Sequence, residues 1–124
     1  MNLIILGAGG FGQTIADVSE QSGEYEKIHF LDDNSTIHRT AYIGPKAVIG
    51  HGTVVLPHSV ISTNCQIGKG CIINCNSTVD HGCIIEDGVH ICLGAIVKAE
   101  NRITKYTKIE AGEVVQARTF PVRR

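Results

Sequence analysis

Residues 55–79 read V-L-P-H-S-V-I-S-T-N-C-Q-I-G-K-G-C-I-I-N-C-N-S-T-V. Every sixth residue of this stretch, counted from Val55, is isoleucine or valine. The same register extends in both directions, so that fourteen consecutive positions from Ile37 to Val115 carry one of these two residues. Chance does not produce such a run, and a short fixed period indicates a repeat architecture.

A second position of the repeat, four residues after each aliphatic residue, carries mostly small side chains. It is occupied by Ala41, Ala47, Thr53, Ser59, Cys65, Cys71, Ser77, Cys83, Val89 and Ala95. Glycines cluster one and three positions after the aliphatic residue, where corners with unusual dihedral angles favour them. We therefore predict a left-handed parallel β-helix over residues 35–117, in which three hexapeptides close one triangular coil. The aliphatic residues fill its narrow interior, and residues 118–124 form a C-terminal tail.

The composition fits such a thin, mainly β fold. Of the 124 residues 43% are hydrophobic, only 5% are aromatic, and fourteen are glycine. Cys65, Cys71 and Cys83 fall on the small inward position and are expected to be buried thiols. Five cysteines without C-x-x-C or zinc spacing indicate neither a disulfide framework nor a zinc site. No apolar run reaches the roughly 18–20 residues of a membrane span, and the start is not a signal peptide, so a cytoplasmic protein is expected.

The charges are unevenly distributed around a net charge of −1. Residues 1–34 hold six acidic residues against one base, and residues 98–124 hold seven bases against three acids. Nucleic acid is an unfavoured partner, because the basic end lacks interleaved aromatic residues and any known motif. A small anionic ligand near the basic end and an ordinary solvated surface both remain open.

The first 34 residues follow a different pattern. Asn2–Leu6 and Lys27–Leu31 are predicted strands, and residues 13–21 have helix-compatible apolar spacing, which makes a short Rossmann-like βαβ unit of residues 1–34. Gly7–Gly12 matches G-x-G-x-x-G, and Asp32 follows twenty residues after Gly12, as in sites for a diphosphate and a ribose hydroxyl. A purely structural glycine-rich turn is the alternative. A nicotinamide-dependent dehydrogenase is not expected, because only one βαβ unit fits before the repeats.

Two of the six histidines stand apart from the rest. His29 falls in a predicted strand, and three others are expected at outward or corner surface positions: His38, His51 and His58. His81 and His90 lie nine residues apart, which is one and a half sides of a triangular coil. They therefore need not touch within one chain but can line one groove when chains associate.

The motifs together resemble a known family. L-I-I-L-G-A-G-G-F-G and F-L-D-D, followed by hexapeptides with V-D-H-G-C and G-V-H-I-C-L-G-A, are similar to the sialic acid O-acetyltransferase NeuD family. That family includes the N-acetyltransferases of UDP-4-amino sugars. The resemblance implies a homotrimer that binds acetyl-CoA between subunits and acetylates an amino or hydroxyl group of a nucleotide-linked or nonulosonic sugar.

The resemblance also implies roles for individual residues. His81 would be the general base, and because Gly82 stands where members often carry an acid, Asp80 would orient the imidazole. His90 would lie near the thioester, with the backbone N–H groups of Gly94 and Ala95 as oxyanion donors. The remaining acetyl-CoA candidates are Ala99, at a position typically glycine, and the possible phosphate ligands Lys98, Arg102 and Lys105. The nucleotide-sugar candidates are Gly7, Gly9, Gly10, Gly12, Asp32 and Asp33.

Two other readings stay open beside this one. A shortened, non-catalytic trimeric β-helix would keep the repeat without an acceptor site, because residues 1–34 make only a fragment of a nucleotide-binding domain. A γ-type carbonic anhydrase would share the fold and bind zinc through three histidines. The sequence lacks the H-x-x-x-x-H pair of that enzyme, so no metal is expected.

Overall fold

The computed structural model describes residues 2–4, 27–29 and 35–123, and nearly all of this part consists of two-residue strands joined by corners. The repeat strands are β3 (Thr36–Ile37), β4 (Tyr42–Ile43), β5 (Val48–Ile49), β6 (Val54–Val55), β7 (Val60–Ile61), β8 (Gln66–Ile67), β9 (Ile72–Ile73), β10 (Thr78–Val79), β11 (Ile84–Ile85), β12 (His90–Ile91), β13 (Ile96–Val97), β14 (Arg102–Ile103), β15 (Lys108–Ile109) and β16 (Val114–Val115). Each predicted hexapeptide thus supplies one strand, which ends on its aliphatic residue.

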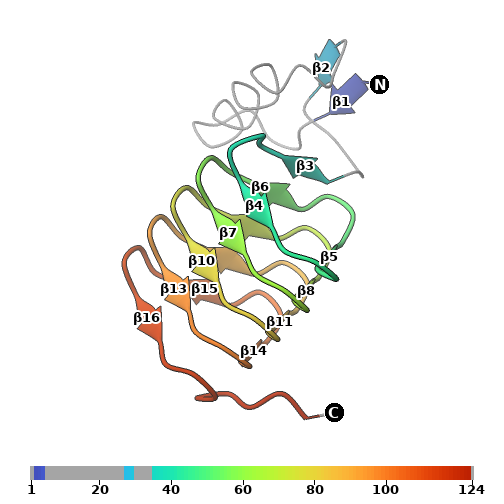
Figure 1. Cartoon of the computed structure of the whole chain (residues 1–124). Helices are drawn as coiled ribbons and strands as arrows, with labels where there is room; N and C mark the ends of the chain where they lie inside the picture. Colours follow the sequence, from blue (N-terminus) through green and yellow to red (C-terminus); the bar gives the residue numbers. More distant parts are fainter. Residues whose placement is uncertain (1, 5–26, 30–34, 124) are drawn as a thin grey trace.

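The strands form three parallel sheets, because each strand pairs with the strand three further along the chain. Sheet 1 contains β4, β7, β10, β13 and β16, sheet 2 contains β5, β8, β11 and β14, and sheet 3 contains β3, β6, β9, β12 and β15. Thr78 pairs with Ile96, so that one coil takes 18 residues. Figure 1 shows the coils stacked in one column, with sheet 1 along one side. The three-sided β-helix predicted from the period is confirmed.

The interior contains the two residue sets that the repeat predicted. The aliphatic residues from Val55 to Val115 are buried and form one continuous cluster. Cys65, Cys71 and Cys83 are at most 1% exposed, which confirms the prediction of buried thiols. All five cysteines are free. Neighbouring coils therefore stabilise one another by stacking the same side-chain types.

Corners require the left-handed backbone region, and glycine serves it without steric cost. Gly88 has a φ of +70°, and a Cβ atom there would collide with the ring of Tyr106. The ring lies one coil further on, because the residues are 18 positions apart. Side chains also occupy such corners, for example Asn76 with a φ of 58°.

One histidine departs from its expected surface position. His38 is only 5% exposed, and burial lowers the pKa of its imidazole. His38 directly follows a strand of sheet 3. The residues at the same position in the next three coils are also buried: Leu56, Asn74 and Cys92. The prediction of a surface histidine is therefore wrong for His38, because the residue after a strand is covered on this sheet. Its Nδ1 lies 2.8 Å from Oγ1 of Thr40.

Within the described residues, parts of both predicted N-terminal strands are present. β1 (Asn2–Ile4) and β2 (Lys27–His29) pair in parallel. The predicted helix over 13–21 and the glycine-rich turn lie outside the described residues, and so do Asp32 and Asp33. Within the part of the chain that is described, no helix is long and apolar enough to cross a membrane.

The end of the chain folds back on the last coil. The backbone N–H of Phe120 donates to Oδ1 of Asn101 at 2.8 Å, and the Phe120 carbonyl accepts the N–H of Arg102 at 2.7 Å. Asn101 is fully buried, and its Nδ2 donates to the carbonyl oxygens of Lys98 and Gln116. This one side chain therefore anchors the C-terminal segment to the β-helix.

Candidate active site

Asp80 and His81 form a carboxylate–imidazole pair at the corner between β10 and β11. Oδ1 of Asp80 lies 3.1 Å from Nδ1 of His81, and it also accepts the backbone N–H of His81 at 2.7 Å. The two side chains are about half exposed, 52% for His81 and 43% for Asp80. One carboxylate oxygen thus holds both the backbone and the ring of the histidine.

The pair has a defined proton arrangement. The hydrogen bond from the backbone N–H of His81 lowers the pKa of Asp80, and the His81 ring and Lys98 lower it further, so the carboxylate stays charged. A charged carboxylate only accepts hydrogen bonds, so the proton of a neutral His81 ring belongs on Nδ1. Nε2 then keeps its lone pair, which is the state that a general base needs. Gly82 contributes no side chain here, and Asp80 is the acid that contacts the ring.

His90 lies on β12 of sheet 3 and is paired with Asn74, from the corner after β9. Oδ1 of Asn74 accepts the N–H of Cys75 at 2.8 Å, which directs its Nδ2 to Nε2 of His90 at 3.1 Å. Nε2 of His90 therefore accepts, and the neutral ring carries its proton on Nδ1. Burial lowers the pKa of His90, and nearby Lys108 lowers it further, which favours the same neutral form.

The two histidines occupy different sides of the coil. His81 sits where sheet 1 meets sheet 2, whereas His90 points outward from sheet 3. Gly94 and Ala95 follow His90 at the corner between sheets 3 and 1. Their N–H groups donate to the carbonyl oxygens of Cys75 at 3.0 Å and Cys92 at 3.1 Å. Both N–H groups thus donate to carbonyl oxygens of the same chain, and their role as oxyanion donors stays a prediction.

The three basic candidates do not gather at one place. Lys98 lies one coil beyond Asp80 and donates from Nζ to Oε1 of Gln116 at 3.1 Å. Ala99, one coil beyond His81, is 7% exposed. Both follow β13 on sheet 1 and therefore lie at the same edge as the pair, one coil nearer the C-terminus.

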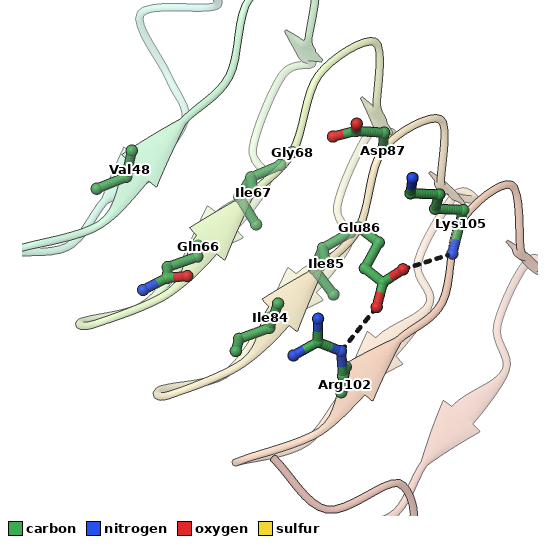
Figure 2. A pocket seen from close by; sticks show the side chains of 10 residues that line it. All are labelled: Val48, Gln66, Ile67, Gly68, Ile84, Ile85, Glu86, Asp87, Arg102 and Lys105. Atoms are coloured by element: carbon green, nitrogen blue, oxygen red, sulfur yellow. Dashed lines mark hydrogen bonds and ion pairs between the residues drawn. The ribbon is translucent and has the colours of Figure 1, made fainter. Parts of the chain in front are cut away.

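Arg102 and Lys105 instead line a shallow hollow of about 490 Å³ on sheet 2, together with Glu86 and apolar residues such as Val48 and Ile84 (Figure 2). Nε of Arg102 donates to Oε2 of Glu86 at 2.7 Å, and Oε1 of Glu86 accepts the backbone N–H of Lys105 at 3.3 Å. The charge of Arg102 is thus paired with Glu86, and the charge of Lys105 also acts on this carboxylate, whose pKa is lowered by the Arg102 hydrogen bond first and by the charge of Lys105 to a smaller degree.

Sequence reasoning did not single out Asn74. It lies sixteen residues before His90, and only the closing of a coil brings the two together. A hexapeptide pattern marks which residues face inward, but it gives no sign of a diagonal contact between outward side chains. Among the described residues, no three His, Cys, Asp or Glu side chains are arranged to hold a metal ion.

Comparison with known proteins agrees with this architecture. Residues 2–54 match the model of the PglD N-terminal domain family. Of the solved structures, the acetyltransferase domain of PglB from Neisseria gonorrhoeae FA1090 superimposes with a TM-score of 0.73 at 21% sequence identity, over 94% of this chain and 82% of that domain. No protein of curated function matches the sequence. The family match therefore concerns the first 54 residues, and the likeness to the solved domain shows that the chain has the same fold, a left-handed parallel β-helix.

Proposed function

We propose that the protein transfers the acetyl group of acetyl-CoA to an amino or hydroxyl group of a nucleotide-linked or nonulosonic sugar, with His81 as general base. The contact between Asp80 and His81 carries the proposal. It leaves Nε2 of an exposed imidazole with a free lone pair at the edge of the β-helix, while the opposite nitrogen is held by a carboxylate. The likeness in fold to an acetyltransferase domain supports the same reaction class.

The proposed reaction needs one proton to move and one acyl bond to be exchanged. Nε2 of His81 accepts a proton from the sugar amine or hydroxyl as that group attacks the thioester carbonyl. The tetrahedral intermediate then expels the coenzyme A thiolate, which takes the proton from the imidazolium. The products are the acetylated sugar and coenzyme A, and His81 returns to its neutral form.

We place acetyl-CoA between subunits of a homotrimer, because the groups it needs lie on different sides of one chain. Several large apolar side chains are exposed on the described part of the chain, including Tyr42, Val48, Leu93, Ile96 and Val114. Three of these residues, Tyr42, Ile96 and Val114, lie on sheet 1, and an exposed apolar face of this kind is typical of a subunit interface. In a trimer, His81 of one subunit can face His90 of the next. A stable monomer in sedimentation at micromolar concentration would contradict this arrangement.

The sugar nucleotide is assigned to the N-terminal segment. The family match over residues 2–54 includes the glycine-rich turn and both aspartates of the motif, Asp32 and Asp33. Backbone N–H groups of such a turn bind a diphosphate, and a following acid binds a ribose hydroxyl. A UDP-linked sugar is therefore the first acceptor class to test.

The test is turnover of acetyl-CoA with a panel of UDP-4-amino sugars and sialic acids, with both products measured by mass spectrometry so that protein thiols do not interfere. His81→Ala is expected to lower kcat by roughly 10²- to 10⁴-fold, the usual contribution of a general base. His51→Ala is the matched control, because His51 is also an exposed corner histidine.

Two outcomes would count against the proposal. Equal rates for the wild-type protein and His81→Ala would remove the base from this residue. Binding of acetyl-CoA without turnover on any sugar of the panel would favour the non-catalytic trimer instead.

A further inference from the structure

Side chains inside the β-helix hold carbonyl groups at the corners of the next coil. Four interior side chains with a donor each contact the carbonyl oxygen that lies fifteen residues further along the chain. The pairs are Thr53 Oγ1 to Gly68 at 2.7 Å, Cys65 Sγ to Asp80 at 3.0 Å, Cys71 Sγ to Glu86 at 3.1 Å and Cys83 Sγ to Lys98 at 3.2 Å. The interior small position is therefore a donor position as well as a space-filling one.

At these four corners the side-chain donor replaces a backbone hydrogen bond that other corners have. At the corner that follows β9, the N–H of Ser77 donates to the carbonyl oxygen of Asn74 at 3.2 Å. At the equivalent corner after β10, no backbone N–H of the described residues donates to the carbonyl of Asp80. The thiol of Cys65 is the donor that this carbonyl receives there.

The capped carbonyl belongs to the peptide group that joins Asp80 to His81. On one side of this peptide plane the carbonyl faces the interior and meets the thiol at 3.0 Å. On the other side its N–H donates to Oδ1 of Asp80 at 2.7 Å, and the same Oδ1 meets the His81 ring at 3.1 Å. Rotation of the plane would move the N–H away from the carboxylate and so change where the carboxylate holds the ring.

We propose that Cys65 is a positioning residue for the Asp80–His81 pair: its thiol fixes the peptide plane from inside the β-helix, and the plane fixes the ring. This inference rests on the proposed function for its catalytic consequence, but its structural consequence is independent of activity. Cys65 itself is fully buried and touches no reacting group.

A thiol and a hydroxyl are both donors, whereas alanine is not. A serine at this position donates at any pH in the working range. Cys65→Ser therefore restores the donor, and Cys65→Ala removes it without adding bulk.

The experiment compares Cys65→Ala and Cys65→Ser with Cys71→Ala as the matched control. Cys71 is equally buried and caps Glu86 in the same way, one side of the coil away from His81. Cys65→Ala is expected to lower kcat about 3- to 10-fold, the effect of one modest hydrogen bond, with the KM for acetyl-CoA unchanged. In the wild-type protein, the ¹⁵N signals of the His81 ring should show a proton on Nδ1. The Cys65→Ala substitution should shift these signals away from that pattern. Cys65→Ser should recover both readouts.

The ring signals keep the two proposals separate. If His81→Ala were fully active, the proposed function would fail, yet a shifted ring in Cys65→Ala would still support the positioning role. Unchanged ring signals in Cys65→Ala would overturn it. An equal loss of kcat in Cys65→Ala and Cys71→Ala, at equal loss of thermal stability, would also overturn it, because the effect would then be one of general core packing.

Discussion

Replacing Asp80 with asparagine separates the orienting role of the carboxylate from the base itself. Asparagine has nearly the same shape, and its Oδ1 can still accept the backbone N–H that now reaches Asp80 at 2.7 Å. The corner should therefore keep its conformation. What is lost is the negative charge opposite Nδ1 of His81, and with it the preference for a ring that keeps its lone pair on Nε2.

The size of the effect follows from the exposure of the pair. A hydrogen bond to a charged group contributes about 1.5–3 kcal/mol when it is well shielded. Because His81 is 52% and Asp80 43% exposed, solvent screening reduces this to about 1–2 kcal/mol. At about 1.4 kcal/mol per factor of ten, kcat should fall roughly 5- to 30-fold. This loss is smaller than that expected for His81→Ala.

The assay is steady-state turnover of acetyl-CoA with the best acceptor of the sugar panel, at saturating concentrations of both substrates. Glu100→Gln is the control, since it removes a carboxylate that pairs with Arg118 near the same edge of the β-helix but contacts no histidine. Thermal unfolding of both variants checks that the fold is intact.

Two results would refute the reasoning. If Asp80→Asn stayed within twofold of the wild type while His81→Ala was inactive, the carboxylate would have no orienting role. If Asp80→Asn lost as much activity as His81→Ala, the carboxylate would be as essential as the imidazole, and the magnitude derived from a solvent-screened contact would be wrong.

Two further predictions concern stability. Burial lowers the pKa of His38 and His90 below the ordinary 6.5, so the unfolded chain binds more protons and the free energy of unfolding should fall as the pH falls below about 6.5. Urea titrations at several pH values measure this dependence, and His90→Gln should make it weaker. An unchanged pH dependence would mean that groups other than His90 cause it. Asn101→Ala should cost about 2–4 kcal/mol, because three hydrogen bonds of a buried amide are lost, including the one from Phe120. Arg118→Ala, which breaks only an exposed ion pair, should cost less than about 1 kcal/mol, and equal losses would contradict the anchoring role of Asn101.

The fold could be predicted because a short repeat fixes the direction of each side chain. Once Ile61 and Ile67 are known to share a register, Cys65 between them has to face the interior, and all three are at most 3% exposed. The identity of the neighbouring residues hardly matters, since the period alone decides which positions face inward.

The arrangement of the candidate site could be predicted only in part. The proximity of Asp80 to His81 follows from their adjacency, but the direction of the carboxylate depends on how the corner is closed. The contact of His90 with Asn74 and the burial of His38 depend on the separate environment of sheet 3, which a repeat common to all three sheets does not encode. The glycines and aspartates proposed for the nucleotide lie outside the described residues and stay a prediction.

The interior small position also explains why size alone is a poor guide to this core. Alanine would fill the space of Cys65 or Cys71 nearly as well, and it is found at Ala47 and Ala95. The thiols differ from alanine in that each donates to a carbonyl of the next coil. A substitution that is conservative in volume can therefore release a corner of the chain about fifteen residues away. Because the proposed base sits on one such corner, we expect the interior of the β-helix to affect its chemistry although no interior side chain reaches a substrate.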